Sequence, residues 1–314
     1  TYGDMKTYAA KSADMGKTWK MFTSDAFKGY AHKIKEDLVS KDLLFLGTEM
    51  GLYTSIDGGN NWLQMKGHIP DYALVRDMTI EPKTNDLVVG THGRGVLIVD
   101  DISPLRKINA ELLNKDVAVL PDRPYAISNG HYQYFWDSEY GYVGPNSSED
   151  AVITYYLKQR LNSGKVTVQI YDDKGNFVVD FPGTKRKGLN IITWNMRMKP
   201  PRVAEGGAKA DFGASTTGPL VRPGKYKIKI TAGDKSAEGE LQLIVDPKAK
   251  TTEAEREENY NAVMRTYKMQ EDLALLMDSV LAEQKRIKDL QNEAPVVKEY
   301  FDSLEAIRAE LVPV

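Results

Sequence analysis

Over most of its length the chain alternates short apolar runs with turns rich in Gly, Asp and Asn. Residues 43–46 form one such run, and a second strand is expected at 51–53. Apolar and polar residues alternate with period two at 166–171 and 223–230, as in half-buried strands. Further strands are expected at 76–80, 87–89, 96–99, 117–121, 153–157, 177–179, 189–194 and 241–245. The pattern predicts a mainly β protein.

A repeat of 43 positions runs through the first part of the chain. The pattern S-x-D-x-G-x-(T/N)-W occurs twice, and Gly47-Thr48 recurs 43 positions later as Gly90-Thr91. A period in the low forties fits one four-stranded blade of a β-propeller. The motif residues are Ser12, Asp14, Gly16 and Trp19 in the first copy and Ser55, Asp57, Gly59 and Trp62 in the second.

The motif residues are expected to have structural roles. An Asp side chain in a turn accepts hydrogen bonds from backbone N–H groups, and Gly takes a positive φ. The Trp ring is expected to be buried against neighbouring strands. Asp14 and Asp57 are therefore interpreted as turn-stabilising residues, and no metal site is expected because the ligand series of a calcium loop is missing.

Both copies of the motif resemble the Asp-box of bacterial-neuraminidase-repeat (BNR) propellers, a group that includes sialidases, xyloglucan-cleaving glycosidases and sortilin-like receptors. Residues 90–105 resemble the closing blade of large secreted bacterial proteins of this kind, which are described as glycosyl hydrolase-like. Two or three blades cannot close a ring, so further blades are expected upstream as partners of this chain. The first residue, Thr1, is not an initiator Met, and no signal-peptide pattern follows it.

The middle of the chain resembles the immunoglobulin-like module of flagellar hook-capping proteins. The residues that carry this resemblance lie at 166–175, 188–194 and 223–230. An aromatic cluster at 132–142 is interpreted as an interface plug between domains, with a carbohydrate platform as the alternative. A Gly- and Pro-rich insertion at 199–221 is interpreted as a flexible excursion, with a cover over a binding face as the alternative.

The last part of the chain has helical spacing. Thr252 and Glu255 match a capping box, and a helix is expected from there to about residue 292. Pro295 begins a second helix at 296–311, which turns back as a hairpin whose apolar stripe forms its core. The fold class is therefore mainly β, with partial propeller blades, an Ig-like β-sandwich and a C-terminal helical hairpin. The expected domains are 1–122, 123–248 and 249–314.

Composition excludes several classes of function. The formal net charge is −2, so a nucleic-acid partner is not expected. Cysteine is absent, which excludes disulfides and thiolate chemistry. No apolar run is long enough for a transmembrane segment. The resemblance to secreted repeat proteins implies a secreted, periplasmic or outer-surface location.

Candidate ligand-binding residues lie in turns of the blades. His92 and Arg94 occupy the turn T-H-G-R-G, and Glu49 lies in the matching turn of the preceding repeat. Such turns can face the central funnel of a propeller, where ligands bind. The alternative is a tight glycine turn with solvated side chains. No catalytic residues are assigned and no cofactor is expected.

Three functional hypotheses follow. The first is a secreted or cell-surface binding or scaffold protein, whose propeller binds a peptide, protein or glycan and whose Ig-like module docks. The second is a sialidase-like or xyloglucanase-like glycoside hydrolase with its catalytic carboxylates in upstream blades. The third is a subunit of a bacterial outer-surface or secretion assembly. A non-enzymatic role is favoured for this stretch of chain.

Overall fold

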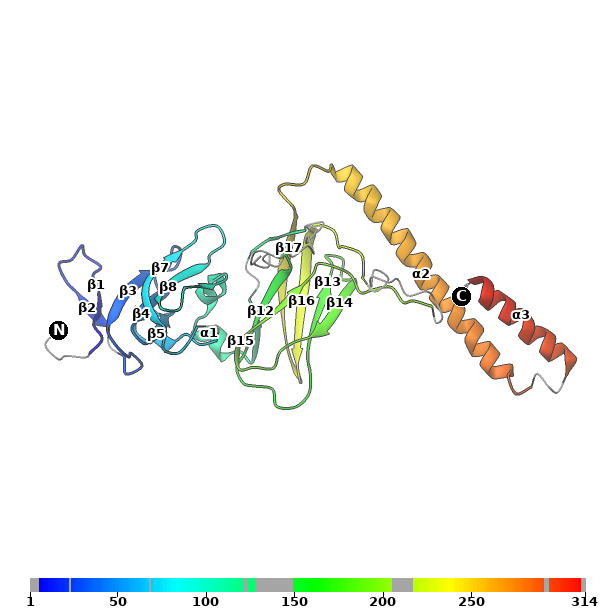
Figure 1. The fold of residues 1–314 in the computed structure, drawn as a ribbon, viewed down its shortest axis with the longest axis horizontal. Coiled ribbons are helices and arrows are strands. Elements are labelled where there is room, and N and C mark those ends of the chain that lie inside the picture. The colour runs from blue at the N-terminus through cyan, green and yellow to red at the C-terminus, as the bar shows by residue number, and fades with distance from the viewer. Residues whose placement is uncertain are drawn as a thin grey trace. The chain divides into compact units, whose positions relative to one another are not determined.

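The computed structural model describes residues 6–22, 24–67, 69–120, 123–127, 149–204, 217–290 and 294–311. It divides into two compact units (Figure 1). One contains residues 1–122 with 154–160 and 187–189, and the other contains 123–153, 161–186 and 190–314. The predicted fold class is confirmed: several β-sheets precede a C-terminal pair of helices. The aromatic cluster at 132–142 lies outside the described residues.

The first unit consists of antiparallel strands that follow the repeat. The first blade is represented by β1 (Ala9–Lys11) and β2 (Lys20–Phe22). The second blade has four strands in chain order: β3 (Ala31–Glu36), β4 (Leu44–Thr48), β5 (Gly51–Ser55) and β6 (Leu63–Gln64). The terminal blade has three: β7 (Leu74–Ile80), β8 (Leu87–His92) and β9 (Val96–Val99).

Apolar residues on the two faces of the second blade form two separate cores. On one face, Leu44, Leu46 and Tyr53 pack with Phe22 of the first blade. On the other face, Phe45 and Leu52 pack with residues of the terminal blade. Alternate residues of a strand point to opposite faces, so a strand buried on both sides is apolar throughout. This explains the uninterrupted apolar run at 43–46.

The segment after the terminal blade contains two short helical elements. They are a 3₁₀ helix η1 (Ser103–Lys107) and an α-helix α1 (Ala110–Asn114). Asn109 separates them because its backbone is extended. Its side-chain oxygen caps the N-terminus of α1 by accepting the N–H of Leu112. An Asn at an N-cap favours a new helix start over continuation.

The sandwich strands form two sheets. One contains β10 (Val117–Val119), β12 (Ala151–Leu157) and β15 (Gly188–Trp194). The other has the order β11-β17-β16-β13-β14, in which all neighbours are antiparallel except β11 and β17. Its strands are β11 (Tyr125–Ile127), β13 (Val166–Tyr171), β14 (Phe177–Pro182), β16 (Gly224–Ala232) and β17 (Lys235–Val245).

The two ends of the insertion at 199–221 are joined by hydrogen bonds. Arg197 and Leu220 form an isolated antiparallel bridge, and the N–H of Met198 donates to the carbonyl of Pro219 at 2.8 Å. The Arg197 guanidinium also donates to the carbonyl of Gly218 at 2.9 Å. The two ends of the insertion are therefore part of the sandwich framework, while residues 205–216 lie outside the described part of the chain.

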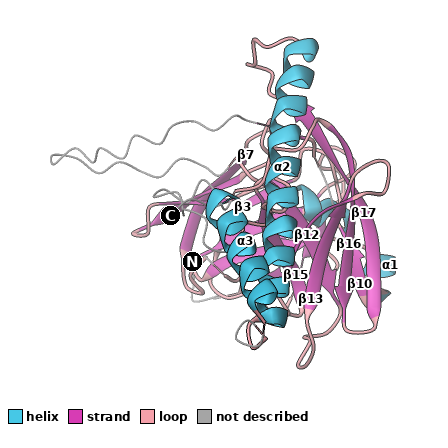
Figure 2. Ribbon diagram, turned by 90° about the vertical axis from the view of Figure 1, so that its right-hand side faces the viewer, coloured by secondary structure: helices cyan, strands magenta, loops and turns pink. Residues whose placement is uncertain are grey.

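The C-terminal helices are α2 (Glu253–Ile287) and α3 (Pro295–Leu311), which run side by side in opposite directions (Figures 1 and 2). The capping box of Thr252 and Glu255 is confirmed. Val280 and Ile287 are buried with Leu304, and Met277 is buried in a separate cluster with Ala204 and Ala274. The C-terminal part of the stripe packs in the hairpin, whereas Val263 and Leu276 are 40% and 49% exposed because α3 is shorter than α2.

Candidate functional site

The two repeat turns, residues 12–19 and 55–62, contain the same set of hydrogen bonds. In the second turn the Ser55 hydroxyl donates to Asp57 Oδ1 at 2.8 Å, and the other Asp57 contacts come from Asn60 and Asn61. The first turn has the matching bonds from the Ser12 hydroxyl and from the N–H and hydroxyl of Thr18 to Asp14. These donors satisfy both carboxylates within their own turns.

These hydrogen bonds lower the pKa of both aspartates. The N–H and then the hydroxyl of Thr18 lower the pKa of Asp14 to about 2 from an ordinary value of 3.8. Burial acts to raise the pKa of Asp57, but the N–H and amide of Asn61 outweigh it and leave the pKa lowered. Both side chains are thus held ionised as acceptors.

Glycine is required in the second turn for two reasons. Gly59 has a φ of 89°, which L side chains rarely adopt. A Cβ at Gly59 would also lie 2.3 Å from the Phe22 ring of the first blade. In the first turn Gly16 has a similar φ of 88°.

The two repeat tryptophans differ in their surroundings. Trp62 is 4% exposed and packs edge-to-face with Phe22 and Phe27 at centroid distances of 5.6 and 5.4 Å. Trp19 is 64% exposed, so the expectation of a buried ring is wrong at this position. The physical reason is that Phe22 and Phe27 cover Trp62 from the preceding repeat, whereas no described residue takes the equivalent place beside Trp19.

The predicted ligand residues lie in equivalent turns but do not form one cluster. Glu49 follows β4, and its carboxylate accepts the N–H of Tyr30 at 3.3 Å. His92 is the last residue of β8, Arg94 lies in the turn that follows it, and both are exposed. Within the described structure, no hydrogen bond or ion pair joins Glu49 to either of them. Glu49 anchors the segment that leads into β3.

Sequence reasoning missed a pair of β-bulges in β3 and β7, the first strands of the second and terminal blades. Ala31 pairs with Thr48 and Lys33 with Gly47, which leaves His32 as the extra residue. Val75 pairs with Thr91 and Asp77 with Gly90, which leaves Arg76 as the extra residue. The sequence signal that could have indicated these bulges is the recurring Gly-Thr pair, which lies opposite each of them. A bulge redirects a side chain and is common beside functional sites.

The two bulged side chains meet. Arg76 Nη1 lies 3.4 Å from His32 Nδ1. A guanidinium has only donors, so Nδ1 is the acceptor in this contact. His32 Nε2 is buried and has no hydrogen-bond partner among the described residues. An unpaired buried donor costs free energy and is uncommon in structural positions.

Charged residues surround this contact. Lys33 Nζ lies 2.7 Å from Asp77 Oδ1, and the Lys33 side chain is the largest cause that lowers the pKa of Asp77. Lys35, on the same strand as Lys33, adds a further favourable charge interaction with Asp77. We call His32, Lys33, Lys35, Arg76 and Asp77 the inner-strand surface. It combines three permanent positive charges with one carboxylate.

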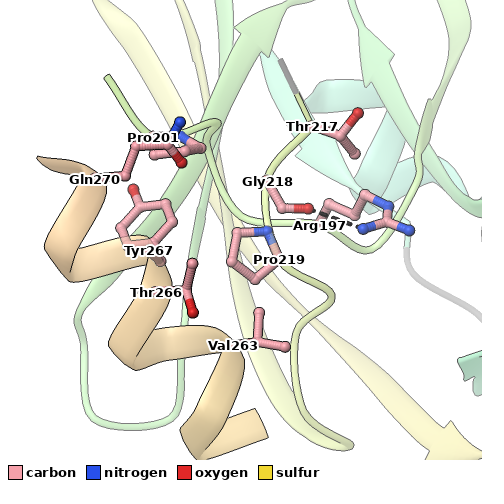
Figure 3. A pocket seen from close by; sticks show the side chains of 9 residues that line it. All are labelled: Arg197, Pro201, Thr217, Gly218, Pro219, Val263, Thr266, Tyr267 and Gln270. Carbon is pink, nitrogen blue, oxygen red and sulfur yellow. Dashed lines mark hydrogen bonds between the residues drawn. The ribbon is translucent and has the colours of Figure 1, made fainter. Parts of the chain in front are cut away.

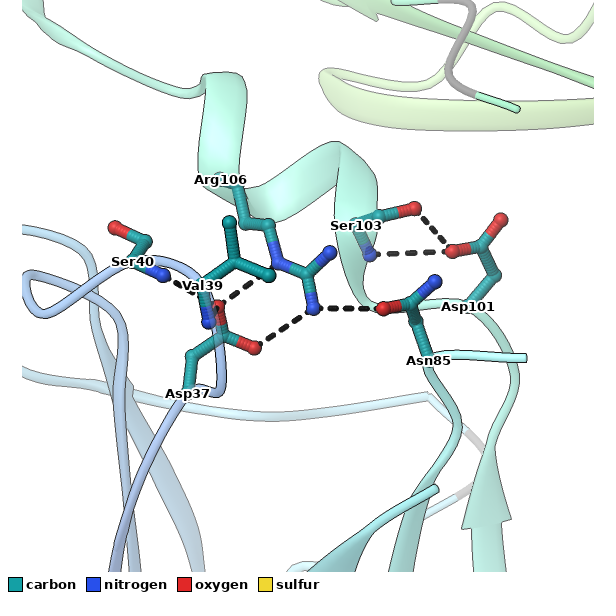
Figure 4. A network of polar contacts seen from close by, with 7 residues as sticks. All are labelled: Asp37, Val39, Ser40, Asn85, Asp101, Ser103 and Arg106. Atoms are coloured by element: carbon teal, nitrogen blue, oxygen red, sulfur yellow. Dashed lines mark hydrogen bonds and ion pairs between the residues drawn. The ribbon is translucent and has the colours of Figure 1, made fainter. Parts of the chain in front are cut away.

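A second polar cluster fixes the exit from the terminal blade (Figure 4). Arg106 donates to both carboxylate oxygens of Asp37, at 2.8 and 2.9 Å, and to Asn85 Oδ1 at 2.9 Å. Asp101 accepts from the N–H and hydroxyl of Ser103. Both Asp37 oxygens are matched to protein donors, which is typical of a structural cluster.

The second unit contains a cavity of about 520 Å³ beside α2 (Figure 3). Val263, Thr266 and Tyr267 of α2 line one side, and the ends of the insertion line the other. Arg197 is already bound to the Gly218 carbonyl. An adjoining cavity of about 630 Å³ contains Arg222, which pairs with Glu257 and lies 5.3 Å from the Tyr260 ring centre. The Arg197 and Arg222 guanidinium groups are therefore committed to internal contacts.

The described residues contain neither a cluster of metal-binding side chains nor a membrane-spanning helix. No group of three or more His, Asp or Glu side chains is placed there to hold a metal ion. No helix in that part of the chain is both long and apolar enough to cross a membrane.

Comparison with known proteins gives no family. No family model matches the sequence, and no curated protein matches it. Solved structures with local similarity include dimeric latent PorU from Porphyromonas gingivalis, at 13% identity and a TM-score of 0.24 over 51% of this chain. The extracellular domain of BT4673 from B. thetaiotaomicron matches at 12% identity and a TM-score of 0.24 over 76% of this chain.

The matches cover little of the known proteins. The chain spans 12% of the PorU chain and 28% of the BT4673 chain. The extracellular domain of BT3049 from the same organism gives 10% identity, a TM-score of 0.22 and 28% coverage of its own length. At these values no common fold is assigned, so the description of the fold rests on the strands and cores of this chain.

Proposed function

We propose that this chain is part of a secreted or cell-surface binding protein, in which the blades bind an anionic ligand and the sandwich and helical pair act as a docking or spacing module. The location follows from the resemblance of the repeat turns to those of secreted propellers. Further blades of the same repeat complete the binding domain.

The contact between His32 and Arg76 carries this proposal. Two neighbouring blades each place a β-bulge at the same point, and the bulged side chains touch at 3.4 Å. A bulge interrupts strand pairing, so two equivalent bulges are a cost to the sheet that a binding role explains. First strands of adjacent blades converge on the central channel of a propeller, where ligands have access.

Charge favours an acidic ligand over a basic one. The two strands carry more positive than negative charge, because Asp77 faces Lys33, Lys35 and Arg76. Glu36 is paired with Lys11 of the first blade at 2.7 Å. Strands β3 and β7 each lie at the edge of their sheet, so each has backbone groups that an extended peptide can pair with. We therefore propose an acidic peptide segment as the ligand class.

The two repeat carboxylates are not suited to be the proton donor of a glycosidase. A glycosidase needs one carboxylic acid with a raised pKa as its proton donor. Hydrogen bonds lower the pKa of Asp14 and of Asp57. These two residues are suited to holding their turns and unsuited to general acid catalysis.

The test is peptide binding measured by fluorescence anisotropy. The probes are labelled octaglutamate and octalysine at low salt. Octaglutamate is expected to bind, binding should weaken as salt rises, and Arg76→Ala should weaken it by roughly tenfold. Lys115→Ala, which removes an exposed charge just after α1, is the matched control. Equal binding of the two peptides, or equal losses in the two variants, contradicts the proposal.

A glycosidase screen on the same protein tests the alternative function, glycoside hydrolysis. Chromogenic sialosides and xyloglucan oligosaccharides are the substrates. The proposal expects no sugar release above that of a heat-denatured sample. Turnover would overturn the binding-only assignment and direct attention to the carboxylates of the funnel.

A further inference from the structure

One flank of the C-terminal helical pair has exposed apolar residues at regular spacing. On α2, Leu276 and Leu290 are 49% and 41% exposed, and two heptads separate them, which places them on the same face of the helix. On α3, Val296, Tyr300 and Ile307 are 74%, 48% and 44% exposed. Their spacing of one turn and then two turns also places them on one face.

The two faces belong to the same flank of the pair. Glu283 lies midway between Leu276 and Leu290 and therefore shares their face of α2. Its carboxylate pairs with Arg286 at 2.6 Å, and the guanidinium of Arg286 interacts electrostatically with Tyr300 of α3. We call the following residues the open flank: Leu276, Glu283, Arg286, Leu290, Val296, Tyr300, Ser303 and Ile307.

The open flank is separate from the apolar contact that holds the two helices together. Val280 and Ile287 of α2 are buried against Leu304 of α3. The five apolar residues of the open flank present on the order of 500 Å² of apolar surface, which is at the upper end for a monomer. The polar residues between them raise this area toward the roughly 800 Å² per partner of a standard interface.

On α3 the flank residues are complementary to themselves in antiparallel orientation. Tyr300 and Ser303 form an inner pair, and both are exposed. Val296 and Ile307 form an outer pair that is centred on the same point of the helix. When two α3 helices pack antiparallel about a two-fold axis at that point, Val296 of one copy lies against Ile307 of the other.

The same axis matches the flank residues of α2. Leu276 and Leu290 lie equally far from Glu283, so they also meet across a two-fold axis that passes Glu283. The contact between Arg286 and Tyr300 puts this point level with the centre of the α3 set. Each copy brings one ion pair of Glu283 and Arg286 to the axis, so the charges that meet there cancel.

We propose that two copies of this chain associate through the open flank, with their α2–α3 pairs packed antiparallel as a four-helix bundle. Heptad-spaced apolar residues on two facing helical layers are the packing of such bundles. The interface lies within the second unit and is independent of the ligand bound by the inner-strand surface.

The first test is sedimentation velocity of the 314-residue chain at about 1 to 100 μM, where a dimer is expected. Leu276→Glu places an unpaired charge in the interface and should weaken dimerisation roughly a hundredfold. Leu275→Glu is the matched control, because Leu275 is 56% exposed but lies about 100° around α2 from its neighbour. Circular dichroism of both variants verifies that the helices are retained.

The second test is crosslinking through single introduced thiols, since the chain contains no cysteine. Ser303→Cys lies beside the two-fold axis, so a short bismaleimide should join two copies. Val296→Cys lies roughly 16 Å along the helix from its counterpart, at a rise of about 1.5 Å per residue, and should crosslink at least tenfold less. Four results would overturn the proposal: a monomer at the highest concentration, a dimer unaffected by Leu276→Glu, an equal loss with Leu275→Glu, or equal crosslinking at both positions.

Discussion

Arg106 binds Asp37 through two parallel hydrogen bonds, although 69 positions separate them along the chain. The Asp37 side chain is fully buried and that of Arg106 is 15% exposed. The pair joins the 3₁₀ helix η1, after the terminal blade, to the end of strand β3 in the second blade. It therefore fixes how the chain leaves the blades.

Removal of the guanidinium is expected to be strongly destabilising. Arg106→Ala leaves a buried carboxylate without its counter-charge, and a broken buried pair costs about 3–5 kcal/mol. Urea unfolding followed by circular dichroism measures the free energy of unfolding. Lys115→Ala, which breaks an exposed pair with Glu111, should cost about 1 kcal/mol or less. Similar losses in both variants would contradict the structural role of Arg106.

The same pair should make stability depend on pH. Burial acts to raise the pKa of Asp37, but the Arg106 guanidinium and the N–H groups of Ser40 and Val39 outweigh it and lower the pKa. A lowered native pKa contributes stability that is present above the ordinary value of 3.8 and is lost as pH falls through the native value. Acid unfolding should therefore begin at higher pH in Asp37→Asn. An unchanged acid midpoint would rule out this contribution.

The repeat tryptophans should respond unequally to truncation. Trp62→Ala removes a buried ring with two aromatic partners and should cost about 3–5 kcal/mol. Trp19→Ala removes a mostly exposed ring and should cost about 1 kcal/mol or less. Denaturant unfolding of the two variants measures the difference. Equal costs would mean that residues outside the described part of the chain cover Trp19.

The pKa of Asp14 should fall well below its ordinary value. Carbon-detected NMR titration should give about 2, and Thr18→Val should raise the pKa toward 3.8 because the hydroxyl donor is lost. The backbone N–H of Thr18 remains, so the rise is expected to be partial. Thr84→Val removes a hydroxyl that binds Glu81 instead and should leave Asp14 unchanged. A pKa near 3.8 in the unmodified protein would contradict the turn geometry.

Two equivalent glycines should differ in tolerance to a side chain. In the 314-residue chain, Gly47→Val forces Val75 to move and should destabilise by about 1–3 kcal/mol. Gly90→Val meets no close atom and has no positive φ to relieve, so its melting temperature should stay near that of the unmodified chain. Differential scanning calorimetry compares them. A large loss with Gly90→Val would show that its face is already covered in this chain.

The sequence alone was sufficient for elements defined by local pattern. Most strands fall where apolar runs or period-two alternation predicted them, because burial on one or both faces leaves a direct trace in the sequence. The capping box of Thr252 and Glu255 is likewise local, since both hydrogen bonds lie within one helical turn. The strand Ala31–Glu36 was missed because half of its residues are charged, and its place in the sheet depends on pairing with β4.

Only the tertiary structure decided which side chains are buried and which residues from different strands are in contact. Trp19 and Trp62 occupy the same motif position, but only Trp62 has Phe22 and Phe27 against it. His32 and Arg76 meet because two bulges align across blades, and neither bulge is visible in a single strand. Gly47 and Gly90 are likewise identical in sequence and differ in that Val75 lies over only one of them. A repeat motif fixes local hydrogen bonds, whereas burial and contact require the neighbouring sheet, which the motif does not encode.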